Sequence, residues 1–298
     1  MSQHLELPPE SPPELESPET TARLPNFLYI GTSKAGSTWI YRLLARHPQV
    51  FIAPAKGTYY FDHHFDRGLQ WYQDHFRRAD HQSVVGELSH SYLYSREAAQ
   101  RIRELLPSAK LMVCLREPVD RAFSDYLALV KNGRFEGTFA QALQDVPALT
   151  EKGTYATQLS MYLEYFPRAQ LHVALFDELK ENPQGFADGL HSFLEIESLE
   201  LTDEMRQKVM PAARPRSRWA TQVAKRVAKA FDRVGWGAVR GRAKRSRLVR
   251  NILYRPYAPN ERPTLDAVQR EELKRHFRDE VKLLDELLGQ DLSARWGY

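Results

Sequence analysis

The feature that most constrains this chain is a short apolar run that passes through a glycine-bracketed turn into a helical pattern. The run covers 27–30, the turn lies between Gly31 and Gly36, and the helical pattern covers 38–47. Glycine lets the backbone approach a ligand closely, and the free N–H groups and dipole of the following helix attract an anion. The sequence therefore predicts a strand, an anion-binding loop and a helix in succession.

This loop matches a Walker A phosphate loop only in part. The glycines have the Walker spacing, but Ser37 stands at the lysine position, and the lysine is Lys34, three residues earlier. The apolar run at 111–115 leads into Arg116, where a nucleoside triphosphatase would place a magnesium-binding aspartate. We therefore expect an anion to bind without a Walker-type metal, which disfavours a nucleotide kinase. A tight turn with a solvated lysine is the structural alternative.

Arg116 and Ser124 form a second candidate anion site. Ser124 lies eight residues after Arg116, about two turns into a helix predicted at 119–131 after Pro118. Arginine offers a planar fork of donors that suits phosphate, and serine adds one hydroxyl donor. The pair could hold a second phosphate. An arginine that caps its own turn is the alternative.

Strand and helix patterns alternate along the chain. Apolar runs at 84–85 and 171–176 predict two further strands, and helical patterns cover 95–106, 155–166 and 265–288. This alternation predicts an α/β fold, a single domain with a central, mostly parallel sheet flanked by helices. Ligands of such sheets bind beyond the carboxyl ends of the strands.

The charge is distributed unevenly. The formal net charge is +4, yet 214–255 holds fourteen Lys/Arg and one acidic residue, which leaves the rest of the chain at −9. An amphipathic helix is expected at 219–234 within this basic segment. The helix either packs on the domain with a solvated cationic face or presents that face to an anionic glycan or to lipid headgroups. No nucleic-acid motif accompanies the charge, so a nucleic-acid partner is not expected.

Residues 1–24 are expected to form a disordered tail, because five prolines and five glutamates leave few large apolar side chains to bury. The sequence shows no apolar run long enough to span a membrane and no signal pattern at its start. Its one cysteine, Cys114, excludes an intrachain disulfide. We expect a cytoplasmic protein whose domain covers 25–298, with 214–255 as a candidate for peripheral membrane contact.

Together and in this order, the loop and the Arg116/Ser124 pair resemble the PAPS-dependent sulfotransferases, where PAPS is 3′-phosphoadenosine 5′-phosphosulfate. Further blocks resemble the heparan sulfate branch of that family in the right order: Lys-Glu-x-x-Phe-Phe at 56–61, Gly-x-x-Trp-Tyr at 68–72, Gly-Glu-x-Ser/Thr-Pro-x-Tyr at 86–92 and Gly-x-Tyr-x-x-Gln-Leu at 153–159. The resemblance spans 25–298 and implies the P-loop-kinase-like sulfotransferase fold.

The resemblance implies transfer of a sulfuryl group from PAPS to a hydroxyl or amine of a carbohydrate, glycolipid or glycosylated natural product, with PAP as the product and no required metal. The 5′-phosphosulfate would be held by Lys34, Ala35, Gly36, Ser37, Thr38 and Trp39, with Lys34 also catalytic. The 3′-phosphate would be held by Arg116 and Ser124, under a covering loop that contributes Arg214, Arg216, Ser217 and Arg218. The acceptor side would include Lys56, Asp62, His63 and His90.

The catalytic base is where the sequence departs from the family pattern. In the heparan sulfate branch a glutamate serves as the base, and Gly57 occupies its position. Glu87 is the preferred substitute, since it follows a predicted strand and should face the cleft. A structural carboxylate is an equally open interpretation of Glu87, and His90, Asp62 and His63 are the other candidates. A catalytically impaired or inactive PAPS-binding protein is the alternative function.

Overall fold

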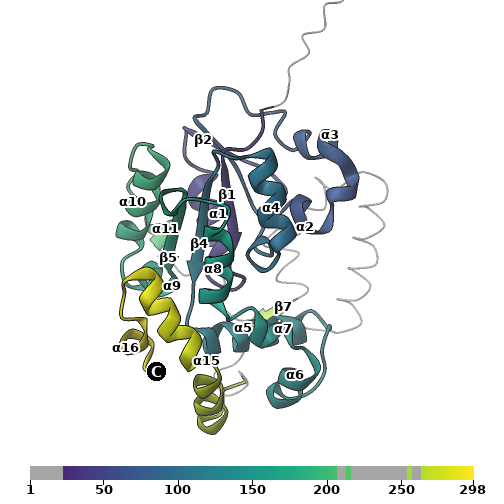
Figure 1. Ribbon diagram of the computed structural model, residues 1–298, viewed down its shortest axis with the longest axis vertical. Helices are drawn as coiled ribbons and strands as arrows, with labels where there is room; N and C mark the ends of the chain where they lie inside the picture. Colours follow the sequence, from purple (N-terminus) through teal and green to yellow (C-terminus); the bar gives the residue numbers. More distant parts are fainter. Residues whose placement is uncertain (1–22, 207–212, 216–253, 257–262) are drawn as a thin grey trace, which may run out of the picture.

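The computed structural model describes residues 23–206, 213–215, 254–256 and 263–298 of the chain. At its centre lies a five-stranded, all-parallel sheet in the order β2-β3-β1-β4-β5, with helices on both faces (Figure 1). The strands are β1 (Phe27–Gly31), β2 (Val50–Ile52), β3 (Val84–Leu88), β4 (Lys110–Leu115) and β5 (Leu171–Leu175). The predicted α/β class is confirmed.

The helices predicted within the described residues are all present. Ser95 caps one of them as expected, because its Oγ accepts a hydrogen bond from the N–H of Ala98 at 3.1 Å. The α-helices are α1 (Ser37–Leu44), α2 (Tyr60–His63), α3 (Gly68–Gln73), α4 (Arg96–Leu105), α5 (Pro118–Lys131), α6 (Phe139–Asp145), α7 (Ala148–Glu151), α8 (Tyr155–Leu163), α9 (Phe176–Glu181), α10 (Pro183–Leu194), α11 (Asp203–Arg206), α15 (Ala267–Leu288) and α16 (Leu292–Trp296). Short 3₁₀ turns are η1 (Phe65–Arg67), η2 (Tyr92–Tyr94) and η3 (Arg168–Gln170).

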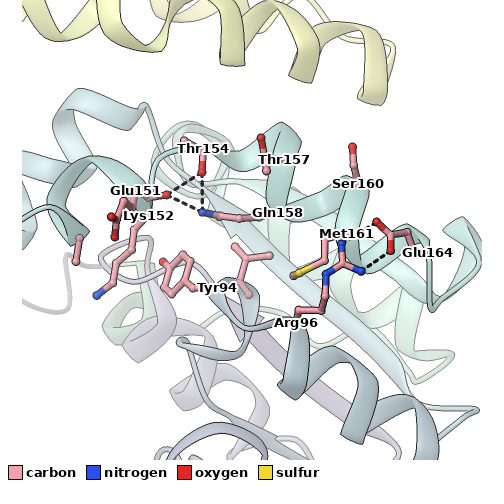
Figure 2. A pocket seen from close by; sticks show the side chains of 12 residues that line it. Tyr94, Arg96, Glu151, Lys152, Thr154, Thr157, Gln158, Ser160, Met161 and Glu164 are labelled. Carbon is pink, nitrogen blue, oxygen red and sulfur yellow. Dashed lines mark hydrogen bonds and ion pairs between the residues drawn. The ribbon is translucent and has the colours of Figure 1, made fainter.

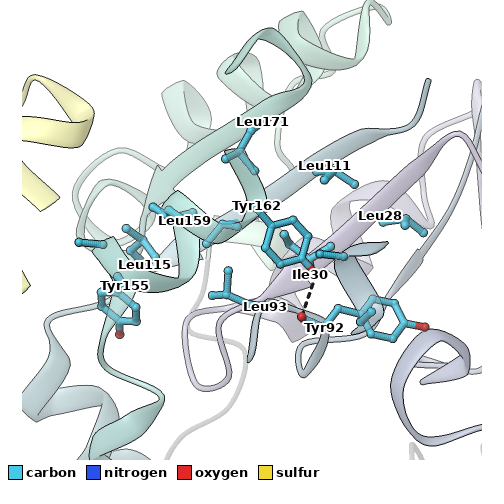
Figure 3. Packing of buried hydrophobic residues seen from close by; sticks show 14 of the residues in the cluster. Leu28, Ile30, Tyr92, Leu93, Leu111, Leu115, Tyr155, Leu159, Tyr162 and Leu171 are labelled. Carbon is cyan, nitrogen blue, oxygen red and sulfur yellow. Dashed lines mark hydrogen bonds between the residues drawn. The ribbon is translucent and has the colours of Figure 1, made fainter. Parts of the chain in front are cut away.

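Two apolar layers sandwich the sheet, because successive side chains of a strand point to opposite faces. Leu28 of β1 packs in a layer with α4, α5, α8 and α15, and Phe27 packs in the opposite layer with α1 and α10. Figure 3 shows part of the first layer, where the Tyr162 hydroxyl donates to the carbonyl oxygen of Tyr92 at 2.8 Å. Both faces of the sheet are therefore covered, as a parallel sheet requires.

The parallel strands bring three loops to one edge of the sheet. Gly31 ends β1, Leu88 ends β3 and Leu115 ends β4, so the segments that follow them meet at the carboxyl edge. A separate antiparallel pair, β6 (Ala213–Pro215) with β7 (Tyr254–Pro256), joins the two ends of the basic segment, and β6 contacts α5. The candidate site is therefore built from the loops at this edge.

Two residues that the sequence placed in the tail belong to the domain instead. Arg23 Nη1 donates to the carbonyl oxygen of Asp80 at 2.6 Å, and Leu24 packs on the core. The rest of the expected tail, 1–22, and the expected amphipathic helix at 219–234 lie outside the described residues. In the part of the chain that the structure describes, no helix has the length and apolar character needed to cross a membrane.

Candidate active site

Gly36 shapes the loop between β1 and α1. It is the N-cap of α1 with a left-handed φ of 84°, and an ideal Cβ at this position would lie 2.7 Å from Cδ2 of Leu179. Both the conformation and the space therefore require glycine. Among the described residues no side chain caps α1, so its first N–H groups, at Ser37 and Thr38, are available to an anion.

Lys34 and Arg116 bring two positive charges to this loop. Arg116 Nη1 donates to the carbonyl oxygen of Lys34 at 3.1 Å, and its guanidinium carbon lies 5.1 Å from the ring centroid of Phe176. Burial lowers the pKa of Lys34; the carboxylate of Asp125 opposes this shift and the charge of Arg116 adds to it. Burial also lowers the pKa of Arg116. Two desolvated cations held side by side favour a bound anion.

Helix α5 contributes Ser124 and its neighbour Asp125 to the same region. Asp125 Oδ2 accepts a hydrogen bond from Ser33 Oγ at 3.3 Å and lies 3.5 Å from Nη1 of the fully buried Arg121. Ser124 is half-buried on this helix. The sequence identified Ser124 but missed Asp125, because a carboxylate near a phosphate loop has no local pattern that singles it out.

Lys56 lies at the start of α1. Its Nζ donates to Thr38 Oγ1 at 2.6 Å and to Ser37 Oγ at 3.3 Å. The sequence grouped Lys56 with the acceptor contacts, which stays a prediction, and the structure places its Nζ at the first turn of α1. A third cation therefore lies at the helix terminus where an anion is expected.

Trp39 and residues 214–218 are the remaining predicted phosphate contacts. The N–H of Trp39 donates to the carbonyl oxygen of Gly36 at 2.8 Å in the first turn of the helix, and the phosphate contact expected of Trp39 stays a prediction. Arg214 lies on β6, which contacts α5, and nothing is described of its side chain. Arg216, Ser217 and Arg218 lie outside the described residues.

Glu87 lies at 0% exposure on β3, and both its carboxylate oxygens accept hydrogen bonds. Oε2 accepts from the N–H of Thr58 at 3.1 Å, from the Thr58 hydroxyl and from Ser89 Oγ at 2.9 Å. Oε1 accepts from the hydroxyls of Tyr92 at 2.9 Å and Tyr72 at 3.1 Å. Burial and the charge of Glu87 raise the pKa of both tyrosines well above their usual value, so they keep the protons that they donate. This geometry favours the structural interpretation of Glu87 over a catalytic base.

A tyrosine ring fills the space beside Gly57. An ideal Cβ on Gly57, whose φ is 145°, would lie 2.7 Å from Cε2 of Tyr59. The Tyr59 hydroxyl lies 3.0 Å from Nε2 of His90, and the two rings meet edge to face. Burial lowers the pKa of His90 to about 4, helped by the charges of Lys152 and Lys56. Burial raises the pKa of Tyr59 to about 12.

Asp62 and His63 lie on the helix that follows this turn. The carboxylate of Asp62 accepts hydrogen bonds from the Ser91 hydroxyl and, at 2.7 Å, from the N–H of His63. The His63 side chain is 67% exposed, with its ring centroid 6.0 Å from that of Tyr59. Asp62 therefore holds the local turn, and His63 lies at the surface. No group of three or more His, Cys, Asp or Glu side chains in the described ranges could hold a metal ion.

A pocket of about 590 Å³ lies beside these loops, between η2, α7 and α8 (Figure 2). At one end the Arg96–Glu164 ion pair closes it, and at the other Lys152 Nζ lies 5.4 Å from the ring centroid of Tyr94. The Tyr94 hydroxyl also accepts a hydrogen bond from the N–H of Ser33 at 3.1 Å, so the pocket adjoins the phosphate loop. The sequence missed Tyr94 and Lys152, although the block at 153–159 marked one wall.

Comparison with known proteins identifies the class. Residues 24–285 match the family model described as the sulfotransferase domain. The chain therefore belongs to this family. Its structure also resembles the crystal structure of a sulfotransferase from Alicyclobacillus acidocaldarius, with a TM-score of 0.67 and 26% identity, covering 93% of this chain and all of that one.

Two human proteins of the heparan sulfate branch are similar to this chain. Human heparan sulfate glucosamine 3-O-sulfotransferase 3A1 is 30% identical over 195 residues, or 62% of this chain and 48% of that protein. Human bifunctional heparan sulfate N-deacetylase/N-sulfotransferase 3 is 32% identical over 200 residues, or 60% of this chain and 23% of that protein. The matches thus span half or less of these relatives' length. The resemblance to this branch is confirmed.

Proposed function

We propose that the chain transfers the sulfuryl group of PAPS to a hydroxyl or amine of a carbohydrate, glycolipid or glycosylated natural product. The observation that carries the proposal is that Lys56 contacts the first turn of α1, which no described side chain caps, while Arg116 donates to the carbonyl oxygen of Lys34 in the loop just before it. Cations at a helix N-terminus suit a ligand with phosphate and sulfate groups. Membership of the sulfotransferase family supports PAPS as that ligand.

The donor supplies a sulfuryl group on a phosphate leaving group, and the residues of this chain would do the rest. The N–H groups of Ser37 and Thr38 hold the 5′-phosphate, while Arg116 and Ser124 hold the 3′-phosphate. As the bond between sulfur and the bridging oxygen breaks, negative charge collects on that oxygen. Lys34 stabilises this charge as a mobile point charge. The reaction then needs the acceptor oxygen in line and a base for its proton.

We place the acceptor in the pocket between η2, α7 and α8 (Figure 2). Its walls offer hydroxyl and amide groups of the kind that bind sugar hydroxyls. Gln158 Oε1 in particular is buried and has no hydrogen-bond partner among the residues that the structure describes. The charges at its ends are mixed, with Lys152 near the loop and the Arg96–Glu164 pair opposite. The likeness to the two human heparan sulfate sulfotransferases supports a carbohydrate acceptor.

The alternative is a chain that binds PAPS without transferring sulfate, and Gly57 favours it because the expected carboxylate is missing. Both functions predict that PAP binds, so titration calorimetry with PAP comes first. The Lys34→Ala/Arg116→Ala variant should bind PAP at least 100-fold more weakly, since each charge-assisted hydrogen bond contributes about 1.5–3 kcal/mol. Arg46→Ala, which removes an exposed ion pair with Glu204, is the matched control and should bind normally.

Unchanged PAP affinity in the double variant would contradict the site. Sulfate transfer is then measured with ³⁵S-labelled PAPS and N-sulfated heparosan oligosaccharides. PAP binding together with ³⁵S in the oligosaccharide supports the enzyme. PAP binding without PAPS consumption by any acceptor, water included, supports the non-catalytic alternative.

A further inference from the structure

We propose that Tyr59 and His90 together replace the glutamate that Gly57 lacks, and that His90 receives the acceptor's proton through the Tyr59 hydroxyl. The inference rests on the proposed function and deepens it, because it assigns the base of the same reaction.

The first support is the space that the Tyr59 ring occupies. An ideal Cβ on Gly57 would lie 2.7 Å from Cε2 and 2.9 Å from Cζ of this ring, closer than side-chain carbons normally approach. A glutamate side chain would begin in that space. The N–H of Tyr59 donates to Ser89 Oγ at 3.0 Å, and Ser89 in turn donates to Glu87. The buried carboxylate therefore anchors the residue that fills the space.

The second support is the protonation state of the pair. Burial lowers the pKa of His90 to about 4; the charges of Lys152 and Lys56 add to this shift, and the carboxylate of Asp125 opposes it. The imidazole is therefore neutral near pH 7 and can accept a proton. Because the pKa of Tyr59 is raised to about 12, the phenol keeps its proton, and in the tautomer that we propose it donates a hydrogen bond to Nε2, 3.0 Å away. The other ring nitrogen, Nδ1, is buried without a partner in the described part of the chain, and in this tautomer it carries the hydrogen.

The third support is the place of the pair between donor and acceptor. The charge of Lys56 helps to lower the pKa of His90, and the same lysine donates a hydrogen bond to Thr38 in the first turn of α1. The charge of Lys152 also helps to lower the pKa of His90, and Lys152 lines the proposed acceptor pocket. The carbonyl oxygen of His90 lies 3.3 Å from the ideal Cβ position of Gly31, at the start of the phosphate loop. The pair therefore lies beside the loop between β1 and α1 and shares a neighbour, Lys152, with the pocket.

In the proposed step one bond to sulfur forms as another breaks, and one proton moves. The acceptor oxygen forms a bond to sulfur while the bond from sulfur to the bridging oxygen breaks, and its electron pair stays on the phosphate of PAP. The acceptor's proton passes to the Tyr59 oxygen as the phenol proton passes to Nε2 of His90. The imidazolium that results loses its proton to water. His90 is thus the base, and Tyr59 carries the proton to it.

The test uses PAPS with water as the acceptor, so that no acceptor need be identified. Single-turnover hydrolysis of PAPS to PAP and sulfate is followed in the full chain. His90→Gln should lower the rate constant by about 100-fold or more, and Tyr59→Phe by at least about tenfold, while PAP affinity stays within about threefold. His172→Gln is the control, because His172 is another imidazole with its pKa lowered to about 4, stacked on Phe193. It should leave both quantities unchanged.

The pH–rate profile separates a proton-transfer role from a structural one. Tyr59→Phe removes a donor to the neutral imidazole of His90, so the acid limb of the residual rate should move to higher pH. A rate for His90→Gln within threefold of wild type would overturn the inference. A wild-type chain that binds PAP but does not hydrolyse PAPS would also overturn it and leave the donor site standing. Failure to bind PAP would instead refute the proposed function.

Discussion

Replacing Glu87 by glutamine separates its two interpretations, structural carboxylate and catalytic base. The side chain keeps its size, but one oxygen becomes an NH₂ group. That group must face either the hydroxyls of Tyr72 and Tyr92 or the donors of Thr58 and Ser89. On either side the NH₂ group faces groups that donated hydrogen bonds to the carboxylate. The negative charge that strengthened all five hydrogen bonds is also lost.

The expected loss of stability follows from those contacts. Hydrogen bonds to a charged group contribute about 1.5–3 kcal/mol each, and at least two are lost or weakened. Rotation of the hydroxyls recovers part of this, so we expect about 3 kcal/mol of destabilisation. In a chain of this size each kcal/mol lowers Tm by about 2–4 °C, which corresponds to a fall of roughly 6–12 °C.

Thermal unfolding followed by circular dichroism measures this effect, with PAPS turnover measured below the transition. Glu164→Gln is the control, because its carboxylate pairs with Arg96 at 55% exposure and should contribute less than about 1 kcal/mol. An unchanged Tm with abolished turnover for Glu87→Gln would refute the reasoning and restore Glu87 as the base.

Three further outcomes are expected. Gly36→Ala should weaken PAP binding at least tenfold in calorimetry, because its Cβ would lie 2.7 Å from Leu179 at a left-handed φ. Tyr298→Phe should lower Tm by roughly 3–12 °C, since it removes a 2.6 Å hydrogen bond to the buried carboxylate of Glu117, the neighbour of Arg116. Stability should fall as pH drops from about 6.5 to 4. In this range His172 of the unfolded chain binds a proton, whereas His172 of the folded chain, with its pKa lowered to about 4, stays neutral. This imidazole contributes up to about 3 kcal/mol to the loss, so His172→Gln should flatten the pH dependence of urea unfolding.

Elements with a local signature were predictable from the sequence. The apolar runs of β1 and β4 and the cap of α4 at Ser95 depend on neighbouring residues only, so their patterns can be read directly. Strand β2, three residues long, was not among the predicted strands. The position of the phosphate loop was predictable for the same local reason, since its glycines bracket it.

Contacts between loops were not predictable, because they depend on the order of the strands. Lys56 reaches the first turn of α1, and Tyr59 meets His90, only because β1, β2 and β3 are neighbours in the sheet. The same order brings the donors of the Thr58 turn to Glu87, and these hydrogen bonds favour a structural carboxylate over a catalytic base. No spacing within a single sequence encodes these pairings.

Gly57 and His90 depart from the heparan sulfate pattern at positions that the structure brings together. The pattern has glutamate at the first and proline at the second. With glutamate at 57, the Tyr59 ring could not lie where it does, because the two side chains would overlap. With proline at 90, the Tyr59 hydroxyl would have no imidazole to meet. With glycine at 57, the site keeps a proton acceptor only if position 90 offers one, so on our proposal the base moves from the loop after β2 to the loop after β3.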